Sequence, residues 1–474
     1  MTGRLRNYGY LFPYIIIAGL LIVPCHNSHA GPLKPDTIAR LDQEFQHFSR
    51  DYYQRIVRQS ALPLNSYTNI NELTNRVNEY IKKNQPVYAI ALIHKHHNLL
   101  GNNLDAVEIT QLTSLLLKYN DWHEARRILQ RARDEAGKTA ISNISFQFAR
   151  YFMKRKKWQT TLEYLKDVIN ELSVENADYA NLMTGTILQY EKKHRQAVKY
   201  YKKIKPDSKY YPSAVLNTAI AYIRQDWWTD AHIIINDLVT NNAGKVEDHM
   251  ADRLNLVLGY ALLRKEYFRN SRETFRNIGV NSPYTNKALL GIALSAANQD
   301  DYIGALNAIT ILKDKKSTDL SVDESYLLLP YTYGKLKQYL TASSAYTAAI
   351  KYYQTRISEL EQTAANHSTL VDNISIAGND QDILIGNNTF KFSRYYPVSF
   401  FDNYKALQAI RLTTDIPTDI TAKYNALLSD YQAVLKNIGL HLLNERIDYL
   451  KSYLNQSRYG LARLYDTSLI SANP

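Results

Sequence analysis

The chain has 474 residues, of which 17 are glycine and 13 are proline, together about 6% against about 12% in an average protein. Sheet-rich folds need both residue types at their turns, so their scarcity favours helices joined by short loops. A hydrophobic content of 45% and a charged content of 22% are typical of a folded globular protein and exclude general disorder. Cys25 is the only cysteine, which excludes disulfide scaffolds and multi-cysteine zinc sites.

Residues 1–30 have the pattern of a cleavable signal peptide. Two arginines precede an apolar stretch at residues 11–23, and small residues stand at Ser28 and Ala30, after which we expect cleavage. The apolar stretch is shorter than the ~20 residues of a spanning helix, so a signal anchor and a lipid-modified Cys25 are the weaker alternatives. We therefore expect a periplasmic protein without a stable membrane span after cleavage. The net charge is +12 for the full chain and +10 without the two arginines of residues 1–30, which indicates acidic proteins, anionic envelope polymers or lipid head groups as partners, and no nucleic acid.

Residues 31–69 are expected to form a helical cap. Ile38, Leu41, Phe45 and Phe48 recur at spacings of three and four residues, which is the pattern of one buried helix face. We predict that this helix covers the first of the repeats that follow it.

A repeat runs through the middle of the chain. Small residues recur at intervals of 34 to 40 residues, at Ala89, Ala125, Thr161, Ala197, Ala231, Ser271, Ala305 and Ala342. Four residues after each of them stands a large apolar or aromatic side chain, namely Ile93, Leu129, Leu165, Tyr201, Ile235, Phe275, Ile309 and Tyr346. Each unit is predicted to be a pair of antiparallel helices, in which small residues allow close approach and large ones fill the space between neighbouring pairs.

This pattern resembles the tetratricopeptide repeat family. The best single match runs over Gly259-Tyr260-Ala261-Leu262, Phe268, Ser271, Phe275 and Pro283, and similar inter-helix turns occur at residues 120–125 and 226–231. The resemblance covers roughly residues 70–352. It implies an all-α fold, a right-handed α-solenoid of about eight stacked helix-turn-helix repeats at residues 70–354, with a helical C-terminal extension and a concave groove for an extended peptide or partner helix.

Three departures from the family pattern carry structural predictions. The proline that closes a repeat is present only near Pro206 and at Pro283, so looser turns are expected elsewhere. The step of 40 residues between Ala231 and Ser271 predicts a longer loop around residues 240–246. Pro330 falls inside a helix in this register, where we expect it to kink or restart the helix.

The C-terminal third has a different character. Residues 355–400 are predicted to be an irregular linker or a small hairpin, in which apolar runs flank Gly386-Asn387-Asn388; a mobile loop is the open alternative. Apolar residues at helical spacing predict one or two long helices within residues 401–474. These helices would pack on the last repeat or pair with another chain.

Basic and aromatic residues recur near the ends of the first helices and are the candidate binding residues. Placed along one groove, they would suit carboxylates or phosphates, with aromatic rings for a peptide or sugar. The candidate ligand-groove residues are Lys118, Lys154, Tyr190, Arg224, Tyr260, Arg264, Tyr331 and Lys335. Two alternatives stay open: the cations only complement the helix dipole in the last turn, and the tyrosines only fill space between helices.

No catalytic, metal or cofactor site is predicted. The sequence has no glycine-rich phosphate loop, no Gly-x-Ser-x-Gly elbow and no His-Glu-x-x-His helix. The only histidine cluster comprises His94, His96 and His97 and lacks a nearby acidic ligand, so we interpret it as a surface patch in which His96 faces the core. We therefore expect a protein that is not an enzyme and has no cofactor.

The predicted function is that of an exported scaffold or adaptor, which binds a protein or peptide partner in its concave groove within a cell-envelope assembly. The alternative is a binder of an anionic glycan or cell-wall polymer, which it would hold through its tyrosine and Lys/Arg stripe. Polar substitution of Leu216, Leu256 or Leu327 is expected to weaken a peptide groove, whereas added salt is expected to weaken a polyanion site.

Overall fold

The computed structural model describes residues 35–59, 65–166, 168–241, 249–315, 319–366, 370–377, 382–391, 398–413 and 416–472. The predicted signal peptide at residues 1–30 lies outside these stretches, and so does most of the longer loop predicted at residues 240–246. Within the described stretches, no helix is both long enough and apolar enough to cross a membrane.

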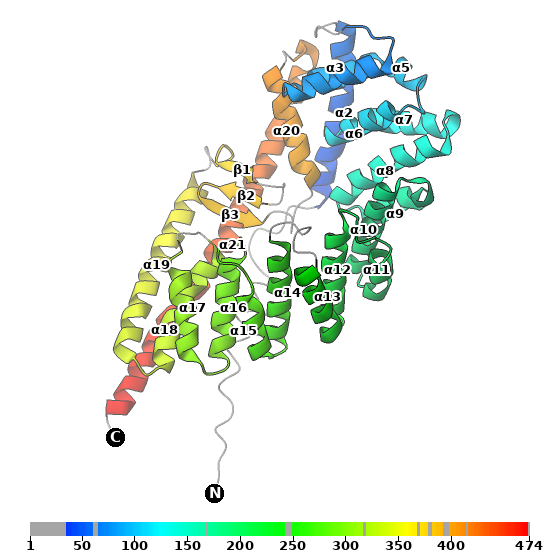
Figure 1. The fold of residues 1–474 in the computed structure, drawn as a ribbon. Helices are drawn as coiled ribbons and strands as arrows, with labels where there is room; N and C mark the ends of the chain where they lie inside the picture. The colour runs from blue at the N-terminus through cyan, green and yellow to red at the C-terminus, as the bar shows by residue number, and fades with distance from the viewer. Residues whose placement is uncertain are drawn as a thin grey trace. The chain divides into compact units, whose positions relative to one another are not determined.

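Antiparallel helix pairs fill the described chain between Ile70 and Ala365 (Figure 1). The first helices of the pairs are α3 (Ile70–Lys82), α6 (Val107–Lys118), α8 (Lys138–Lys154), α10 (Val174–Tyr190), α12 (Tyr211–Ile223), α14 (Met250–Arg264), α16 (Thr285–Ala297) and α18 (Leu320–Lys335). The second helices are α4 (Pro86–Lys95), α7 (Trp122–Glu135), α9 (Trp158–Leu165), α11 (His194–Tyr201), α13 (Trp228–Asn241), α15 (Phe268–Arg276), α17 (Tyr302–Lys313) and α19 (Tyr339–Ala365). Short helices lie between pairs at α5 (His97–Gly101) and η1 (Ile169–Glu171). The all-α repeat architecture predicted from the sequence is confirmed.

The two helices of each described pair are joined by the same tight turn. Shortly after the first helix ends, one residue has a left-handed φ between 56° and 65°; these residues are Asn84, Asn120, Lys156, Lys192, Asp226, Glu266, Asp300 and Lys337. The next amide donates to the carbonyl five residues earlier, as from Asp121 to Leu116 and from Lys193 to Leu188. This is the Schellman motif, which satisfies carbonyls that the helix end leaves unpaired. The regular spacing of the repeats in the sequence therefore reflects a repeated turn geometry.

The small residues of the repeat lie where helices approach closely. A Cβ on Gly185 would lie 2.4 Å from the ring of Tyr201, and one on Gly259 would lie 2.6 Å from the ring of Phe275. Ser271 is fully buried and its hydroxyl donates to the carbonyl of Gly259 at 2.8 Å. Small and large residues thus have the roles that the sequence predicted for them.

Pro330 does not restart its helix, because α18 continues on both sides of it from Leu320 to Lys335. Pro330 and most of its neighbours in α18 are buried, and this packing outweighs the one backbone hydrogen bond that the ring removes. The step of 40 residues between Ala231 and Ser271 includes the segment between the end of α13 at Asn241 and the start of α14 at Met250.

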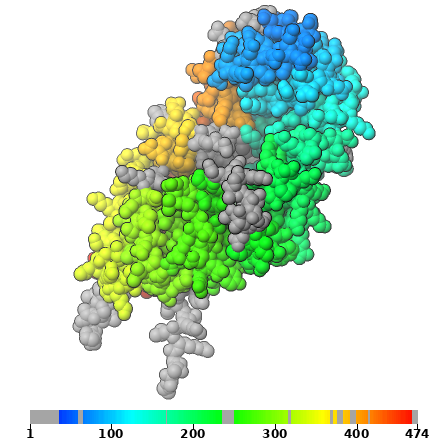
Figure 2. All heavy atoms as spheres, in the orientation of Figure 1, coloured from blue at the N-terminus to red at the C-terminus, as the bar shows by residue number. Residues whose placement is uncertain are grey.

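The described residues form two compact units. Those within 33–246 and 362–442 form the N-terminal unit, and those within 247–361 and 443–474 form the C-terminal unit. Helix α21 (Thr418–Ala472) contributes residues to both units. Consecutive helix pairs within each unit pack against one another. In the space-filling view of Figure 2, the colours follow one another over the surface of each unit in chain order.

Helix α2 (Pro35–Gln59) covers the start of the repeats in the N-terminal unit. It packs on α4 and α7, and also on α20 (Val398–Thr413). The side-chain amide of Gln46 in α2 donates to the backbone carbonyl of Asn120 at 2.7 Å. The hydroxyl of Tyr431 in α21 donates to a backbone carbonyl of α2 at 3.2 Å. The segment predicted as a cap therefore covers the first repeat, as expected, and is also held by the second repeat and by the C-terminal helices.

A small antiparallel sheet in the N-terminal unit follows α19. Its strands have the order β1 (Ile374–Ala377), β2 (Asp382–Ile385) and β3 (Asn388–Lys391). β2 and β3 form a hairpin in which Ile385 pairs with Asn388, and the turn contains Gly386 at a φ of 57°. A Cβ on Gly439 of α21 would lie 2.8 Å from the side chain of Ile374, so the sheet rests on α21.

The later part of α21 packs on α18 and α19 in the C-terminal unit. Tyr453 of α21 donates to Glu324 Oε1 of α18 at 2.7 Å. A Cβ on Gly460 of α21 would lie 2.5 Å from the ring of Tyr346 in α19. Packing on the last repeat is thus realised within the chain, one of the two arrangements that the sequence allowed for this helix.

Candidate binding site

The structure places six of the candidate groove residues at the ends of the first helices. Each is the last helical residue or the residue after it, and each is exposed: Lys118, Lys154, Tyr190, Arg224, Arg264 and Lys335. Cations at this position complement the helix dipole, which is the alternative to ligand binding that the sequence analysis left open. The N-terminal unit holds Lys118, Lys154, Tyr190 and Arg224, and the C-terminal unit holds Tyr260, Arg264, Tyr331 and Lys335. The eight residues therefore divide into two separate sets.

The three candidate tyrosines have different environments. Tyr260 packs edge-on against Phe275 with ring centroids 4.8 Å apart, and its hydroxyl donates to a backbone carbonyl at 2.7 Å. Burial raises the pKa of Tyr260 well above its usual value, as expected for a ring that fills space between helices. Tyr331 is half-buried beneath Lys335, and Tyr190 is 59% exposed. Of the three, Tyr190 offers the most surface to a ligand.

The leucines that the sequence analysis assigned to the groove are core residues. Leu216, Leu256 and Leu327 are 3%, 8% and 2% exposed. They lie on the faces by which first helices pack on their neighbours, so a polar substitution would destabilise the fold without testing a groove.

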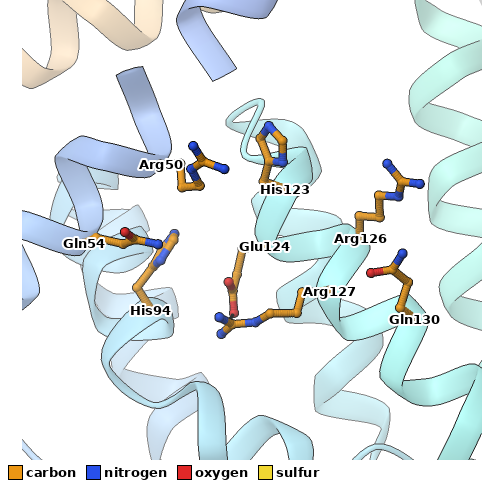
Figure 3. A pocket seen from close by; sticks show the side chains of 8 residues that line it. All are labelled: Arg50, Gln54, His94, His123, Glu124, Arg126, Arg127 and Gln130. Carbon is orange, nitrogen blue, oxygen red and sulfur yellow. Dashed lines mark hydrogen bonds and ion pairs between the residues drawn. The ribbon is translucent and has the colours of Figure 1, made fainter. Parts of the chain in front are cut away.

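A cavity in the N-terminal unit lies between α2, α4 and α7. Its volume is about 380 Å³ and it opens to solvent. Figure 3 shows the side chains that line it, with those of α2 and α4 facing those of α7: Arg50, Gln54, His94, His123, Glu124, Arg126, Arg127 and Gln130. A second cavity of about 200 Å³ shares Glu124 and Arg127 and is further lined by His97 and Arg131.

His94 forms the inner wall of the cavity. Its Nε2 lies 2.6 Å from Oδ2 of Asp121, and its ring stacks on Tyr53 with centroids 5.2 Å apart. Asp121 is the N-cap of α7, where its side chain accepts the amide hydrogen of Glu124. Burial disfavours the charged imidazole, but the charge and hydrogen bond of Asp121 outweigh it and raise the pKa of His94. The inner wall therefore favours a positive imidazolium.

Glu124 and Arg127 form an ion pair on the α7 wall. Arg127 donates to Glu124 Oε1 at 2.6 Å across one turn of helix, and the two side chains point toward each other in Figure 3. The Glu124 side chain is only 6% exposed, whereas that of Arg127 is 53% exposed. Burial raises the pKa of Glu124 against the opposing effects of His94 and Arg127. Arg127 thus keeps donor groups on the solvent side while it balances a buried carboxylate.

Two further guanidinium groups stand on opposite walls of the cavity. Arg50 of α2 contacts Asp51 only at 3.8 Å, and Arg126 of α7 lies over the ring of Trp122 at 5.4 Å. The positive groups of the lining therefore outnumber Glu124, its one carboxylate. Guanidinium groups bind carboxylates and phosphates with two parallel hydrogen bonds, so the cavity is suited to an anionic group.

Sequence reasoning missed this cavity because its walls are distant in the chain. The His94 side chain is only 9% exposed and pairs with a carboxylate, which contradicts the expected surface patch. His96 does face the interior, accepting the backbone amide of Tyr67 at 2.8 Å. In the sequence, Asp121 is recognisable only as part of the inter-helix turn at residues 120–125. Within the described residues, no three His, Cys, Asp or Glu side chains meet as metal ligands.

No family model and no curated protein matches the chain. Among solved structures, the apo form of RapI is 13% identical with a TM-score of 0.44, covering 64% of this chain and 91% of that chain. The apo form of the quorum sensor NprR from B. thuringiensis is 12% identical with a TM-score of 0.34, covering 72% and 97%. The P58(IPK) TPR domain is 13% identical with a TM-score of 0.22, covering 67% and 93%.

At these identities and TM-scores none of the similarities assigns a function. The fold rests on the features of the chain itself, which are the paired antiparallel helices, the small residues at their crossings and the recurring Schellman turn. The chain has a tetratricopeptide-like helical-repeat fold.

Proposed function

We propose that the chain is an exported scaffold that binds a protein or peptide partner, and that the cavity between α2, α4 and α7 receives an acidic group of that partner. The observation that carries the proposal is the set of guanidinium groups on the walls of this cavity (Figure 3). Helical-repeat folds present extended surfaces to partners, and this one adds a defined anion-binding point. The predicted signal at residues 1–30 supports a periplasmic location, which is part of the proposal.

The size of the cavity supports an acidic side chain or a chain terminus as the bound group. A volume of about 380 Å³ is at the lower end of the ~300–1,000 Å³ that is usual for ligand sites. It accepts a carboxylate and a few neighbouring atoms, while the rest of the partner lies across the exposed parts of α2 and α7. Gln54 and Gln130 on the rim supply amide groups for backbone hydrogen bonds.

The ion pair between Glu124 and Arg127 makes binding at this site depend on pH. An incoming carboxylate competes with Glu124 for Arg127, and Glu124 already has a raised pKa because it is buried. Displacement of Glu124 from Arg127 therefore favours its protonation. We expect binding of an acidic group to be accompanied by proton uptake and to strengthen as the pH falls.

The experiment compares a fluorescent hexaglutamate peptide with the matched hexaglutamine peptide. The double variant Arg50→Ala/Arg126→Ala removes two cations that make no close ion pair in the fold, and we expect it to weaken hexaglutamate binding about ten-fold. The control Arg133→Ala/Lys138→Ala removes two exposed cations elsewhere in the same unit and should change little. Equal hexaglutamate binding by the first variant and the wild type would contradict the proposal.

A second experiment identifies the partner in cells. The full-length gene is expressed in a Gram-negative host with a photo-cross-linking residue at Gln130, on the cavity rim, or at Lys138 as the control. We expect recovery from the periplasm and one or two dominant protein adducts from position 130 alone. Recovery without protein adducts but with bound cell-wall or polysaccharide material would favour the anionic-glycan alternative, and retention in the cytoplasm would contradict export.

A further inference from the structure

Three consecutive turns of the N-terminal unit carry aromatic and basic side chains together. They join α8 to α9, α10 to α11 and α12 to α13. We call their combined surface the basic turn edge and define it as Lys157, Trp158, Tyr190, Lys192, Lys193, Arg195 and Trp227. The four cations are exposed, Tyr190 and Trp227 are 59% and 37% exposed, and Trp158 is half-buried. This surface is separate from the cavity between α2, α4 and α7.

Repeat stacking places these side chains next to one another. Trp158 is the first residue of α9 and Tyr190 is the last residue of α10, and their rings stack with centroids 4.8 Å apart and planes 19° apart. Arg195 of α11 lies over the ring of Trp227 in the following turn, 5.3 Å from its centroid. Because the Schellman turn recurs with the repeat, the edge extends continuously across three helix pairs.

The charge of the edge is positive. Its acidic neighbours are Glu191, which accepts from Lys193 at 2.7 Å, and Asp226. Lys154 and Lys156 of the first turn add to the basic groups, and Lys154 Nζ lies 3.8 Å from a carboxylate oxygen of Asp402. Cations outnumber acids in each of the first two turns, so the edge attracts polyanions.

The composition of the three turns narrows the class of polyanion. A membrane surface is bound by projecting aliphatic or aromatic wedges, but residues 154–158, 190–195 and 224–228 contain no Leu, Ile, Val, Phe or Met. The aromatic rings instead lie flat against one another or beneath a guanidinium group. Flat rings between cations suit a chain of ring-shaped units that each carry a negative charge.

We propose that the basic turn edge binds an acidic polysaccharide, with sugar rings against Trp158, Tyr190 and Trp227 and carboxylates on the lysine and arginine side chains. The export predicted from residues 1–30 would bring the edge into contact with envelope glycans and away from nucleic acid. The inference does not depend on the function proposed for the cavity, since the two surfaces share no residue.

The test measures binding of polygalacturonate to the mature chain, with neutral dextran as the uncharged control. We expect the affinity to fall at least ~10-fold between about 50 and about 200 mM salt. The variant Lys157→Glu/Lys192→Glu should weaken binding about ten-fold, and Tyr190→Ala, which removes the most exposed ring, about five-fold. The matched control Lys199→Glu/Lys202→Glu makes the same charge change on exposed residues at the C-terminal end of α11, away from the turn, and should retain most of the affinity.

Two results would overturn the proposal. Equal losses in the edge and control variants would mean that net charge alone attracts the polymer. Tighter binding of a dT30 oligonucleotide or of phosphatidylglycerol vesicles would assign the edge to another class of partner. Unchanged thermal unfolding of all variants shows that the losses do not come from misfolding. Retention of polygalacturonate binding by Arg50→Ala/Arg126→Ala would separate this result from the cavity experiment.

Discussion

Buried carboxylates occur in both units of the molecule, but their surroundings differ. In the C-terminal unit, Asp323 of α18 is fully buried and pairs with Arg446 of α21, whose side chain is only 14% exposed. In the N-terminal unit, Glu124 pairs with Arg127, whose side chain is 53% exposed at the wall of an open cavity. Where both partners are enclosed, the ion pair therefore holds α21 against α18. Where the cation faces solvent, it remains available to a ligand.

Removal of the cation from the enclosed pair is expected to have the largest effect. Arg446→Ala removes the ion-pair partner of the buried Asp323 carboxylate, which keeps the hydrogen bond donated by the Tyr352 hydroxyl at 2.6 Å and the favourable charge of Arg356. An uncompensated buried charge is costly, so we expect the free energy of unfolding of the C-terminal unit to fall by about 3–5 kcal/mol. Urea unfolding followed by circular dichroism measures the change.

Lys451→Ala is the matched control on the same helix. Lys451 pairs with Glu361 at 2.9 Å, and both side chains are 52% exposed. Exposed pairs contribute little, so this variant should change stability by less than about 0.5 kcal/mol. Similar losses in the two variants would mean that burial does not distinguish the pairs.

The second prediction concerns the pH dependence of the C-terminal unit. Burial raises the pKa of Glu324 to about 8, although Tyr453 and Arg446 oppose the shift. The native state thus holds a proton that the unfolded chain releases near its ordinary pKa, so this group stabilises the fold at low pH and loses that contribution as the pH rises toward 8. At about 1.4 kcal/mol for each pKa unit, we expect stability to fall by roughly 3 kcal/mol between about pH 5 and pH 8.

Glu324→Gln tests this assignment. The amide keeps an oxygen to accept from the hydroxyl of Tyr453 but has no proton to lose. The free energy of unfolding of the variant should therefore change little over the same pH range, and the variant should be more stable than the wild type at pH 8. A slope that persists in the variant would assign the pH dependence to another group.

The third prediction concerns the contribution of a buried turn residue to the stability of the N-terminal unit. Asn120 has a φ of 65° and is fully buried; its Oδ1 accepts from the hydroxyl of Tyr151 and from Arg155, each at 2.5 Å. Asn120→Gly keeps the backbone conformation but removes the acceptor from two buried donors, so we expect a loss of about 2 kcal/mol in the free energy of unfolding. The control Asn84→Gly alters the same turn position where the side chain is exposed, and it should not destabilise the protein.

The repeat could be predicted from the sequence because its causes are local. The small residue at 271 and the large one at 275 lie on one helix, and the turn before them needs only neighbouring residues. The cavity and the ion pair between Asp323 and Arg446 could not be predicted in this way, because they depend on segments that are distant in the chain. His94 meets Asp121 across 27 positions, and Arg446 meets Asp323 across 123 positions. Their residue types show no periodic pattern that would identify them as partners.

The smallest predicted effect separates backbone strain from side-chain contacts at the same turn position. Lys192 has a φ of 62° and is exposed, so its Cβ meets the left-handed conformation without a buried contact to offset it. Lys192→Gly should stabilise the N-terminal unit by about 0.5–1 kcal/mol, opposite in sign to Asn120→Gly. Lys192→Ala removes the same charge but keeps a Cβ, so thermal unfolding of this variant should match the wild type. If the alanine variant gains as much stability as the glycine variant, relief of charge repulsion in the basic turn edge, and not backbone conformation, explains the gain.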